Sequence, residues 1–485
     1  MVAAAHTGAG KTTVTIGLIA ALRRRGYDVR PFKVGPDYID PGFLSRAAGH
    51  AARNLDGWLL DAATLRWLFD RHAGRAAVGV VEGMMGLFDG LTGTDDTGST
   101  AHVARTLGLP VVVVLDASRA ARSVAAVARG CQVFDRHLRI AGWVLNRVAG
   151  ETHRHWVTEA VEGSTRRPVL GSLPDDPRLA LPERHLGLVQ AHETLSLGRL
   201  LARLGHDVEQ GVDLARLLRS TRAPRGTVEM PMPPALARLL SGKAVDASTR
   251  PRQSSPAGAG TLRPSRPVVA WARDAAFTFQ YADNIELLET LGARVVAWSP
   301  LADQRLPAGT AAIVLGGGYP ESYAAALADN RPALRMVRAF AEQGGPIYAE
   351  CGGLMYLARG IAAGGRRYRL AGIVPAWARL TGRTRVAYVR AEMLRDTILA
   401  SRGTIVRGHE FHTSSLSPAP AARVAAYRVA DAAAGGPAAP FRLDGYGRAG
   451  VLASYVHVNF LSDPRLAVRF VTGAGKNALI EQRRR

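Results

Sequence analysis

The stretch Ala-His-Thr-Gly-Ala-Gly-Lys-Thr, residues 5–12, decides the fold of this 485-residue chain. A phosphate-binding loop has the pattern Gly, four residues, Gly-Lys-Ser/Thr; Gly10, Lys11 and Thr12 fit it, and Ala5 replaces the first glycine. A short strand is expected over 1–5 and a helix over 12–24, so strand, loop and helix come in the required order. A glycine-rich turn without a ligand is the alternative, but the pattern favours a nucleotide-binding domain.

Each residue type in this loop has a chemical reason to be there. Gly8 and Gly10 let backbone N–H groups curl towards an anion. Lys11 is expected to reach the β- and γ-phosphates of ATP, and the Thr12 hydroxyl to hold Mg²⁺. Asn146, at the end of a later strand, is predicted to read an adenine edge, with a turn residue as the alternative. The predicted ATP-binding residues are Thr7, Gly8, Gly10, Lys11, Thr12, Thr13 and Asn146.

Apolar runs and helical stretches alternate through the first 220 residues. Runs of this kind are typical of buried parallel strands, and their alternation with helices predicts a doubly wound α/β domain over 1–220. Ligands of such domains bind at the carboxyl ends of the strands. The expected strands are 28–34, 76–82, 111–116 and 140–146, and the clearest expected helices are 62–72 and 119–132.

Four acids follow two of these strands. Asp37 and Asp40 come after the strand that contains Lys33, and Glu82 and Asp89 come at the end of the next strand and after it. Beside a phosphate loop, such acids indicate Mg²⁺ coordination and handling of a substrate or intermediate, although loop acids also cap helices. Lys33 is expected to neutralise a phosphate or a substrate carboxylate. The predicted Mg²⁺ ligands are Thr12, Asp37 and Glu82.

The composition changes at about residue 221. Pro, Ser, Gly and Arg dominate residues 221–265, which predicts a linker with one short amphipathic piece at 234–240. A second α/β domain is expected over 266–470, and a basic tail over 471–485. Within the second domain the expected strands are 268–272, 294–298, 311–315 and 346–350, and the expected helices are 283–291 and 322–343.

The strand expected at 346–350 runs directly into Cys351 and two glycines. A cysteine at a sharp strand-to-helix turn resembles a nucleophile elbow, and a helix N-terminus is expected to lower the pKa of its thiol. Backbone N–H groups near Gly317 and Gly352 are the predicted oxyanion hole. A buried structural thiol is the alternative reading of Cys351.

A nucleophilic cysteine needs a base. His457, in Ser-Tyr-Val-His, is the predicted one. His409 and His412 are competitors, and a satisfied core histidine is the alternative for His457 itself.

Charge, apolar runs and cysteine content indicate which partners and which compartment to expect for this protein. The formal net charge is +22, mostly from arginine, yet no helix-turn-helix, zinc finger or aromatic-rich RNA motif appears, so we expect no nucleic-acid partner. Attraction of a polyanionic small substrate is a further use of the charge. No apolar run is long enough to span a membrane and no signal peptide precedes the loop, and two cysteines suit a reducing compartment, so a cytoplasmic protein is expected.

Taken together, the two sites make the chain resemble the cobyrinate (or hydrogenobyrinate) a,c-diamide synthase family of cobalamin biosynthesis. The resemblance covers both domains and fails only in the linker and tail. The run Lys-Val-Gly-Pro-Asp-Tyr-Ile-Asp-Pro at 33–41 is highly specific, whereas the phosphate loop alone would not be. The stretches that carry the resemblance are 7–13, 32–41, 81–90, 315–321, 350–355 and 454–457.

The resemblance implies a synthetase domain related to dethiobiotin synthetase, joined to a class I glutamine amidotransferase domain. Cys351 would attack L-glutamine with His457 as base, and ammonia would pass to the other domain. There ATP, with Mg²⁺, would activate the c and a acetate carboxylates of cobyrinic or hydrogenobyrinic acid as acyl phosphates. A homodimer is compatible with this scheme. The acids that fall on family positions are Asp37, Asp40, Glu82 and Asp89.

Two departures from related sites matter. Many class I amidotransferases carry His-x-Glu, whose Glu orients the base, but here position 459 is Asn. We therefore expect a Cys–His pair whose third member is unassigned. Ala349 also stands where many elbows have glycine.

Three rival functions stay open. A nickel-sirohydrochlorin a,c-diamide synthase would use similar motifs, and so would another tetrapyrrole amidase such as cobyric acid synthase. A P-loop regulatory ATPase with a vestigial amidotransferase domain is a rival of a different class. Such ATPases often carry a second lysine early in the loop, where this chain has Ala5 and His6, and the intact Cys351 and His457 also argue against decay.

Overall fold

The computed structural model describes residues 1–74, 78–181, 183–184, 187–188, 191, 196–222, 230–241, 266–434, 440–448 and 450–484. The chain divides into two compact units, Met1–Met232 and Pro233–Arg485. The boundary falls inside the segment expected to be a linker, of which 223–229 and 242–265 lie outside the described residues. Within the described ranges, no helix combines the length and the apolar character that crossing a membrane requires.

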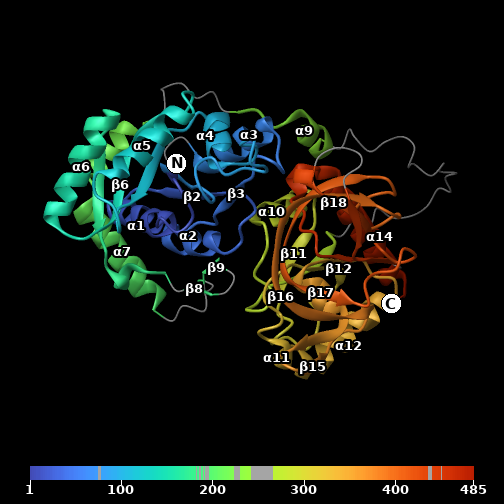
Figure 1. Ribbon diagram of the computed structural model, residues 1–485. Coiled ribbons are helices and arrows are strands. Elements are labelled where there is room, and N and C mark those ends of the chain that lie inside the picture. The colour runs from blue at the N-terminus through green and yellow to red at the C-terminus, as the bar shows by residue number, and fades with distance from the viewer. Residues whose placement is uncertain are drawn as a thin grey trace. The chain divides into compact units, whose positions relative to one another are not determined.

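A seven-stranded parallel sheet forms the centre of the first unit (Figure 1). The first strand, although only three residues long, lies in the middle of this sheet, because it pairs with β4 on one side and β5 on the other. The loop that follows it is therefore placed at the centre of the carboxyl edge, where ligands of such sheets bind. In spatial order the strands are β3 (Arg53–Leu55), β2 (Val29–Val34), β4 (Val78–Glu82), β1 (Val2–Ala4), β5 (Val111–Asp116), β6 (Ile140–Val148) and β7 (Val169–Pro174).

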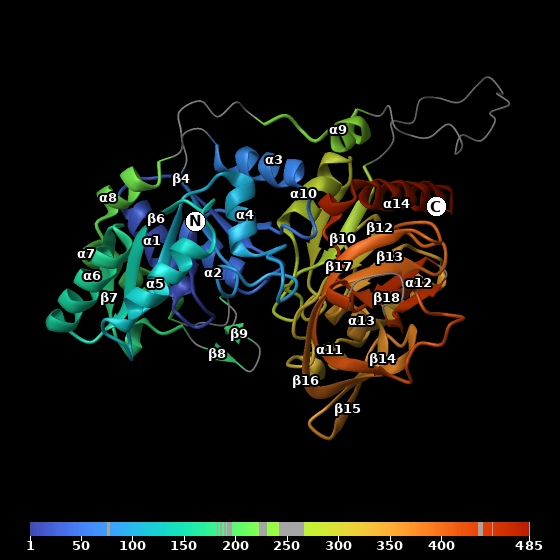
Figure 2. The ribbon, with the colours of Figure 1, turned by 45° about the horizontal axis from the view of Figure 1, so that its top comes forward.

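Helices flank this sheet on both sides, as Figure 2 shows, so the prediction of a doubly wound domain is confirmed. The helix after the phosphate loop packs closely against α7, because Gly17 lies against Val208 and Gly205 against Ala20. The helix expected over 119–132 begins only at Ser123. The helices are α1 (Lys11–Arg24), α2 (Asp40–Ala48), α3 (Ala62–Ala73), α4 (Thr100–Leu107), α5 (Ser123–Phe134), α6 (Glu151–Thr165), α7 (Leu197–Gly211) and α8 (Leu214–Ser220), with a 3₁₀ turn at Pro177–Leu179 and a small hairpin of β8 (Glu183–Arg184) and β9 (Gly187–Leu188).

The second unit contains its own mostly parallel sheet of six strands. Only its edge strand β20 runs antiparallel. In spatial order the strands are β11 (Arg294–Trp298), β10 (Val268–Ala272), β12 (Thr310–Leu315), β13 (Ile347–Glu350), β21 (Val451–Ser454) and β20 (Tyr446–Arg448). The helices of this unit are α9 (Pro234–Leu240), α10 (Ala282–Thr290), α11 (Ala324–Asp329), α12 (Arg331–Glu342), α13 (Gly352–Leu357) and α14 (Pro464–Arg484).

A second sheet in this unit was not predicted from the sequence. Its longest strand, β16 (Val374–Met393), pairs with β17 (Ile405–Ser417) over most of its length, and both are drawn in orange in Figure 1. The backbone of His409 on β17 exchanges hydrogen bonds with that of His457, which ties this sheet to the segment after β21. The remaining strands are β14 (Ala358–Ala363), β15 (Arg366–Arg369), β18 (Tyr427–Asp431) and β19 (Phe441–Asp444).

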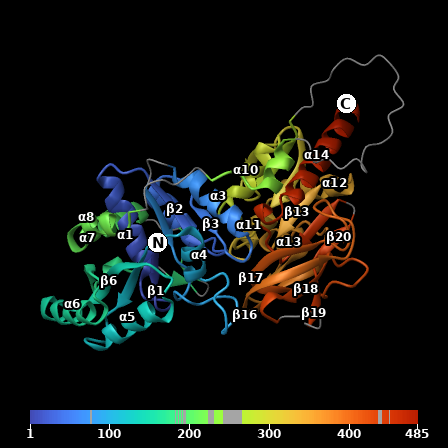
Figure 3. The ribbon, with the colours of Figure 1, turned by 90° about the horizontal axis from the view of Figure 1, so that it is seen from above.

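The prediction of one long helix over 322–343 was wrong. The chain forms α11 and α12 instead, which meet at Asn330. Pro332 has no N–H to continue the first helix, and the Asn330 side chain accepts a hydrogen bond from the N–H of Ala333, so it starts a new one. At the other end of the unit, α14 continues through the residues expected to form a basic tail, and Figure 3 shows it as a single long red helix.

Candidate active sites

The phosphate loop has the backbone that its glycines predict. Gly8 and Gly10 have φ angles of 84° and 92°, in the left-handed region that favours glycine. Thr7 and Gly8 are exposed, and Thr13 is half-buried in the first turn of α1. Asn146 holds the backbone of the loop, because its Nδ2 donates to the carbonyl of Ala9 at 3.0 Å. A Cβ on Gly10 would lie 2.1 Å from that nitrogen, so Asn146 is a support of the loop, and adenine recognition by it stays a prediction.

Two predicted residues, Thr12 and Lys33, converge on one buried oxygen of a third, Glu82, beside the loop. The Thr12 hydroxyl donates to Oε1 of Glu82 at 2.6 Å, and the Lys33 ammonium donates to the same oxygen at 3.0 Å. Lys33 also donates to Oδ2 of Asp40 at 2.5 Å and lies 3.6 Å from Oδ2 of Asp37. The loop after β2 and the end of β4 are thus joined to the start of α1.

Burial and charge tune this cluster. Burial alone would lower the pKa of Lys33, but the carboxylates of Asp40 and Glu82 outweigh it, so the pKa is raised and the ammonium is kept. Burial raises the pKa of Glu82, and Lys33 opposes this only in part. Burial lowers the pKa of Lys11, whose Nζ lies 3.5 Å from the carbonyl of His6.

The donor set of this cluster fits Mg²⁺. Three acids, Asp37, Asp40 and Glu82, surround the ammonium of Lys33, and hydroxyl and carboxylate oxygens are the ligands that Mg²⁺ prefers. Oε2 of Glu82 is buried and, within the part of the chain that the structure describes, has no hydrogen-bond partner. A buried carboxylate oxygen without a partner is costly, and a cation would satisfy it.

Asp89 is exposed, and its carboxylate bonds to the backbone of its own loop, the one that follows β4. Its Oδ2 accepts from the N–H of Gly86 at 2.7 Å, and the N–H of Leu87 donates to the carbonyl of Ala4 at 2.7 Å. The loop after β4 is therefore fastened beside the phosphate loop, and Asp89 lies close enough to Lys11 to act on its pKa.

Sequence reasoning missed a second support of the phosphate loop. Arg147 donates to Oδ2 of Asp116 at 2.6 Å and to the carbonyl of Gly8 at 2.9 Å. Arg147 has a φ of 57°, which is uncommon for a residue with a Cβ. Asp116 ends β5, which pairs with β1, and Arg147 lies near the end of β6, the strand after it in the sheet, and this placement was the available signal. Asp116 also lines a cavity of about 140 Å³ with Ala5 and His6.

In the second unit, Cys351 occupies the sharp turn that the sequence predicts. Its φ is 47°, and its N–H donates to the carbonyl of Ser454 on β21 at 2.7 Å. Such a strained backbone is typical of functional turns. Gly353 donates to the carbonyl of Gly316 at 3.0 Å, which fastens the start of α13 to the loop after β12.

The structure brings the two predicted oxyanion-hole glycines and His457 to this turn. A Cβ on Gly352 would lie 3.1 Å from the backbone nitrogen of Gly318. A Cβ on Gly317 would lie only 2.6 Å from Cε1 of His457. A side chain on Gly317 would therefore displace the base, and one on Gly352 would fit only tightly. The oxyanion hole itself stays a prediction.

The expectation of a lowered thiol pKa was wrong for the resting site. Burial raises the pKa of Cys351, Glu321 raises it further, and the Gly352 N–H opposes them only in part. The cysteine is 2% exposed, and α13 has only six residues. A raised pKa favours the thiol over the thiolate, so activation of Cys351 depends on a neighbouring base.

Both competing histidines have other contacts. The ring of His409 stacks on that of His457, with centroids 4.9 Å apart, and burial lowers its pKa far below the usual range. His412 donates from Nδ1 to the carbonyl of Ser414 at 2.8 Å and stacks on Tyr455. The ring of His457 lies against Gly317 at the elbow, which favours His457 as the base.

We expect replacement of His412 with glutamine to reduce the amount of stability that the protein loses as the pH falls. Burial lowers the pKa of His412 to about 4 from 6.5. Between these pH values the unfolded chain binds a proton there and the folded chain does not, so stability is lost as the pH falls. The wild type should lose up to about 2–3 kcal/mol more than the variant.

Thermal melting of the full chain at pH 7, 5.5 and 4.5 measures this difference. Replacement of the exposed His155 with glutamine is the control and should keep the wild-type pH dependence. Parallel melting curves for the His412 variant and the wild type across this range would contradict the prediction.

The acid that faces His457 is Glu350, and Asn459 has a structural role instead. Asn459 stands where an orienting glutamate is common, but its Oδ1 accepts from the N–H of Leu461 and caps the 3₁₀ turn Phe460–Ser462. Glu350, which precedes the cysteine, lies with Oε2 3.5 Å from Nδ1 of His457. Sequence reasoning missed Glu350, because only the pairing of β13 with β21 brings it to this histidine.

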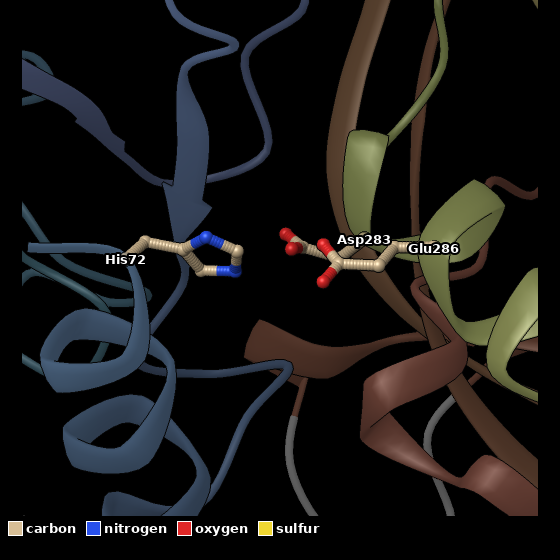
Figure 4. Close-up of side chains that lie close together, drawn as sticks. All are labelled: His72, Asp283 and Glu286. Atoms are coloured by element: carbon tan, nitrogen blue, oxygen red, sulfur yellow. The ribbon is translucent and has the colours of Figure 1, made fainter.

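Figure 4 shows another set of side chains of the metal-binding type. Asp283 and Glu286 project side by side from α10, about one helical turn apart. His72, drawn with them, lies on α3 of the first unit, whereas the two acids belong to the second unit.

Comparison with known families gives two matches. The family model of a CobB/CobQ-like glutamine amidotransferase domain matches residues 268–465. The model of a CobQ/CobB/MinD/ParA nucleotide binding domain matches residues 1–189. The two matches contain the cysteine elbow and the phosphate loop, respectively.

Named relatives are similar to the chain over nearly its whole length. It is 40% identical to a cobyrinate a,c-diamide synthase of Listeria innocua, over 98% of this chain and 99% of the relative. It is 41% identical to a hydrogenobyrinate a,c-diamide synthase of Streptomyces coelicolor, over 97% of this chain and 96% of the relative. A cobyrinate a,c-diamide synthase of Salmonella typhimurium is 39% identical over 98% of this chain and 97% of the relative.

Proposed function

Because this chain belongs to the cobyrinate and hydrogenobyrinate a,c-diamide synthase family, we propose that it amidates the a and c acetate side chains of cobyrinic or hydrogenobyrinic acid with ATP and glutamine. The observation that carries the proposal is that one chain contains two candidate active sites, each with the residues that its half of the reaction needs. One is the phosphate loop with its buried acid–lysine cluster, and the other is the strained cysteine elbow with its histidine.

The second unit is the glutamine-hydrolysing half of this scheme. Cys351 attacks the side-chain carbonyl of glutamine, and His457 takes the thiol proton and passes it to the departing ammonia. Backbone N–H groups at Gly317 and Gly352 stabilise the oxyanion. Water then hydrolyses the thioester, which returns the cysteine and releases glutamate. The packing of both glycines around the elbow supports these roles.

The first unit is the synthetase half. Thr7, Gly8, Gly10 and Thr13 surround the phosphates of ATP, and Lys11 balances charge on the transferring phosphoryl group. The predicted ligands Thr12, Asp37 and Glu82 would hold Mg²⁺, which offsets phosphate charge when bound. The oxygen of Glu82 that lacks a partner supports this assignment. Lys33, Asp40 and Asp89 are the proposed contacts to the substrate or intermediate.

The chemistry explains why two sites are needed. A carboxylate is a poor acceptor for ammonia, because attack must break its resonance. Transfer of the γ-phosphoryl group to a corrin acetate gives an acyl phosphate, and phosphate then leaves as ammonia attacks. The half-reactions consume one ATP and one glutamine for each amide.

Mass spectrometry of the reaction products tests the proposal. With ATP, Mg²⁺ and glutamine, the protein should convert cobyrinic or hydrogenobyrinic acid into a product with two new amides, through a monoamide. Omission of ATP should stop the conversion. If ATP is hydrolysed but neither corrin gains an amide, the substrate assignment is wrong, and nickel-sirohydrochlorin becomes the substrate to test. ATP hydrolysis without any glutaminase activity would favour a regulatory ATPase.

A further inference from the structure

A buried carboxylate faces the proposed base from the residue next to the nucleophile. Glu350 is the last residue of β13 and is 5% exposed, while His457 is fully buried. The register of the two strands places Glu350 opposite Ser454, three residues before His457. Oε2 of Glu350 lies 3.5 Å from Nδ1 of His457. That distance closes to a hydrogen bond with a small movement of either side chain.

The other oxygen of this carboxylate is held in place. Oε1 accepts from the Tyr348 hydroxyl at 2.5 Å and from the N–H of Val458 at 2.9 Å. Val458 follows His457 directly, so one carboxylate holds the backbone at the base and faces its ring. With Oε1 occupied by two donors, Oε2 is the oxygen turned towards the imidazole.

We infer that Glu350 is the positioning residue that orients His457 and stabilises its charged form, which makes the site a Cys351–His457–Glu350 triad. This inference rests on the proposed glutaminase activity. With Nδ1–H directed at Glu350, the Nε2 lone pair is the one that accepts the thiol proton of Cys351. The imidazolium so formed lies beside a carboxylate, which lowers the free energy of the thiolate–imidazolium pair.

Other polar groups near the elbow are committed elsewhere. Oδ1 of Asn459 caps the following 3₁₀ turn. Oδ2 of Asp444 accepts from the Ser454 hydroxyl and the Tyr455 N–H. Glu410 forms ion pairs with two arginines, Arg385 and Arg442. Glu350, by contrast, lies in ion-pair contact with His457.

The test compares two variants of the full chain. Glu350→Gln keeps the shape of the side chain and removes its charge, and should lower the glutaminase kcat by about 30- to 100-fold with the KM for glutamine within about threefold. Asn459→Ser is the matched control: serine also caps a helical turn, so its glutaminase kcat should stay within about threefold of the wild type. Amidation with ammonium salt should be unchanged in both variants.

The pH dependence of Cys351 alkylation separates positioning from simple structural support. Iodoacetamide reacts with thiolate, and mass spectrometry assigns the modified cysteine. Loss of the carboxylate should move the midpoint of Cys351 alkylation upward by about one pH unit. A mere packing defect would change the extent of labelling without moving the midpoint.

A milder variant covers the case in which Glu350→Gln misfolds. Tyr348→Phe removes one donor to Oε1 and keeps the carboxylate, so we expect a three- to tenfold lower glutaminase kcat and a smaller midpoint shift. Wild-type rates and midpoints in both Glu350→Gln and Tyr348→Phe would overturn the inference, as would a selective loss in Asn459→Ser alone. A wild-type protein without glutaminase activity would instead overturn the proposed function.

Discussion

Replacement of Cys351 with serine should abolish glutamine-dependent amidation while ammonium salts still support amidation at the wild-type rate. The expected loss of glutaminase activity is at least about 10³-fold, because a serine hydroxyl at this elbow is a far weaker nucleophile than a thiolate. The change is nearly isosteric at a buried position, so the fold should persist. Rates of glutamate release and of corrin amide formation measure the two halves separately.

The second cysteine provides the control for this prediction. Cys131 is buried in α5, and burial raises the pKa of its thiol, so it is expected to be inert. Cys131→Ser should keep both glutamine- and ammonia-dependent rates within about twofold of the wild type. If Cys351→Ser still released glutamate at a wild-type rate, the nucleophile would have to be another residue.

Replacement of Glu82 with glutamine should have the opposite pattern, with amidation lost and glutaminase activity kept. Oε1 of Glu82 accepts from both Thr12 and Lys33, and its other oxygen is the proposed Mg²⁺ ligand. An amide keeps the shape but removes the charge that holds the metal beside the phosphates. We expect corrin amidation, with glutamine or with ammonia, to fall by about 10²- to 10⁴-fold.

Titration with Mg²⁺ sharpens this second prediction. ADP release should need a higher Mg²⁺ concentration in Glu82→Gln than in the wild type. The matched control is Glu151→Gln, which removes an exposed acid on α6 of the same unit and should change rates by less than about twofold. A Glu82→Gln protein that amidates corrin normally at the wild-type Mg²⁺ requirement would refute the role given to Glu82.

The backbone of both candidate sites could be predicted because each depends on a short contiguous pattern. The phosphate loop needs glycines with positive φ before Lys11, and the elbow needs small residues around Cys351. Patterns of this kind are local, since the chemistry uses the backbone of a single turn. The strand-end acids were also predictable, because parallel strands bring their carboxyl ends to one edge.

Long-range pairing was not predictable in the same way. Glu350 meets His457 across more than a hundred residues, and only the register of β13 and β21 determines that meeting. The second sheet was missed for a related reason. β16 is rich in arginine and half-exposed, so its apolar alternation is weak, and its stability comes from pairing with β17 and β18.

Two local predictions failed because a competing local effect was stronger. Pro332 and the Asn330 cap divide the helix expected over 322–343. The thiol of Cys351 lies next to a short helix, but its burial and the nearby Glu321 outweigh the N–H groups there, so its pKa is raised. In both cases the sequence contained the signal, and the relative strength of the two effects decided the outcome.

The close packing of α1 against α7 determines how far the nucleotide-binding half extends as a separable piece. The matched family region ends at residue 189, before α7 begins at Leu197. Gly17 and Gly205 let these helices approach so closely that an added methyl group would meet Val208 at 2.5 Å or Ala20 at 2.9 Å. A fragment cut at residue 189 would expose the apolar side of the helix that carries Lys11 and Thr12, and would be prone to aggregate. We therefore expect a fragment that folds by itself to include α7 through Gly211, beyond the end of the matched family region.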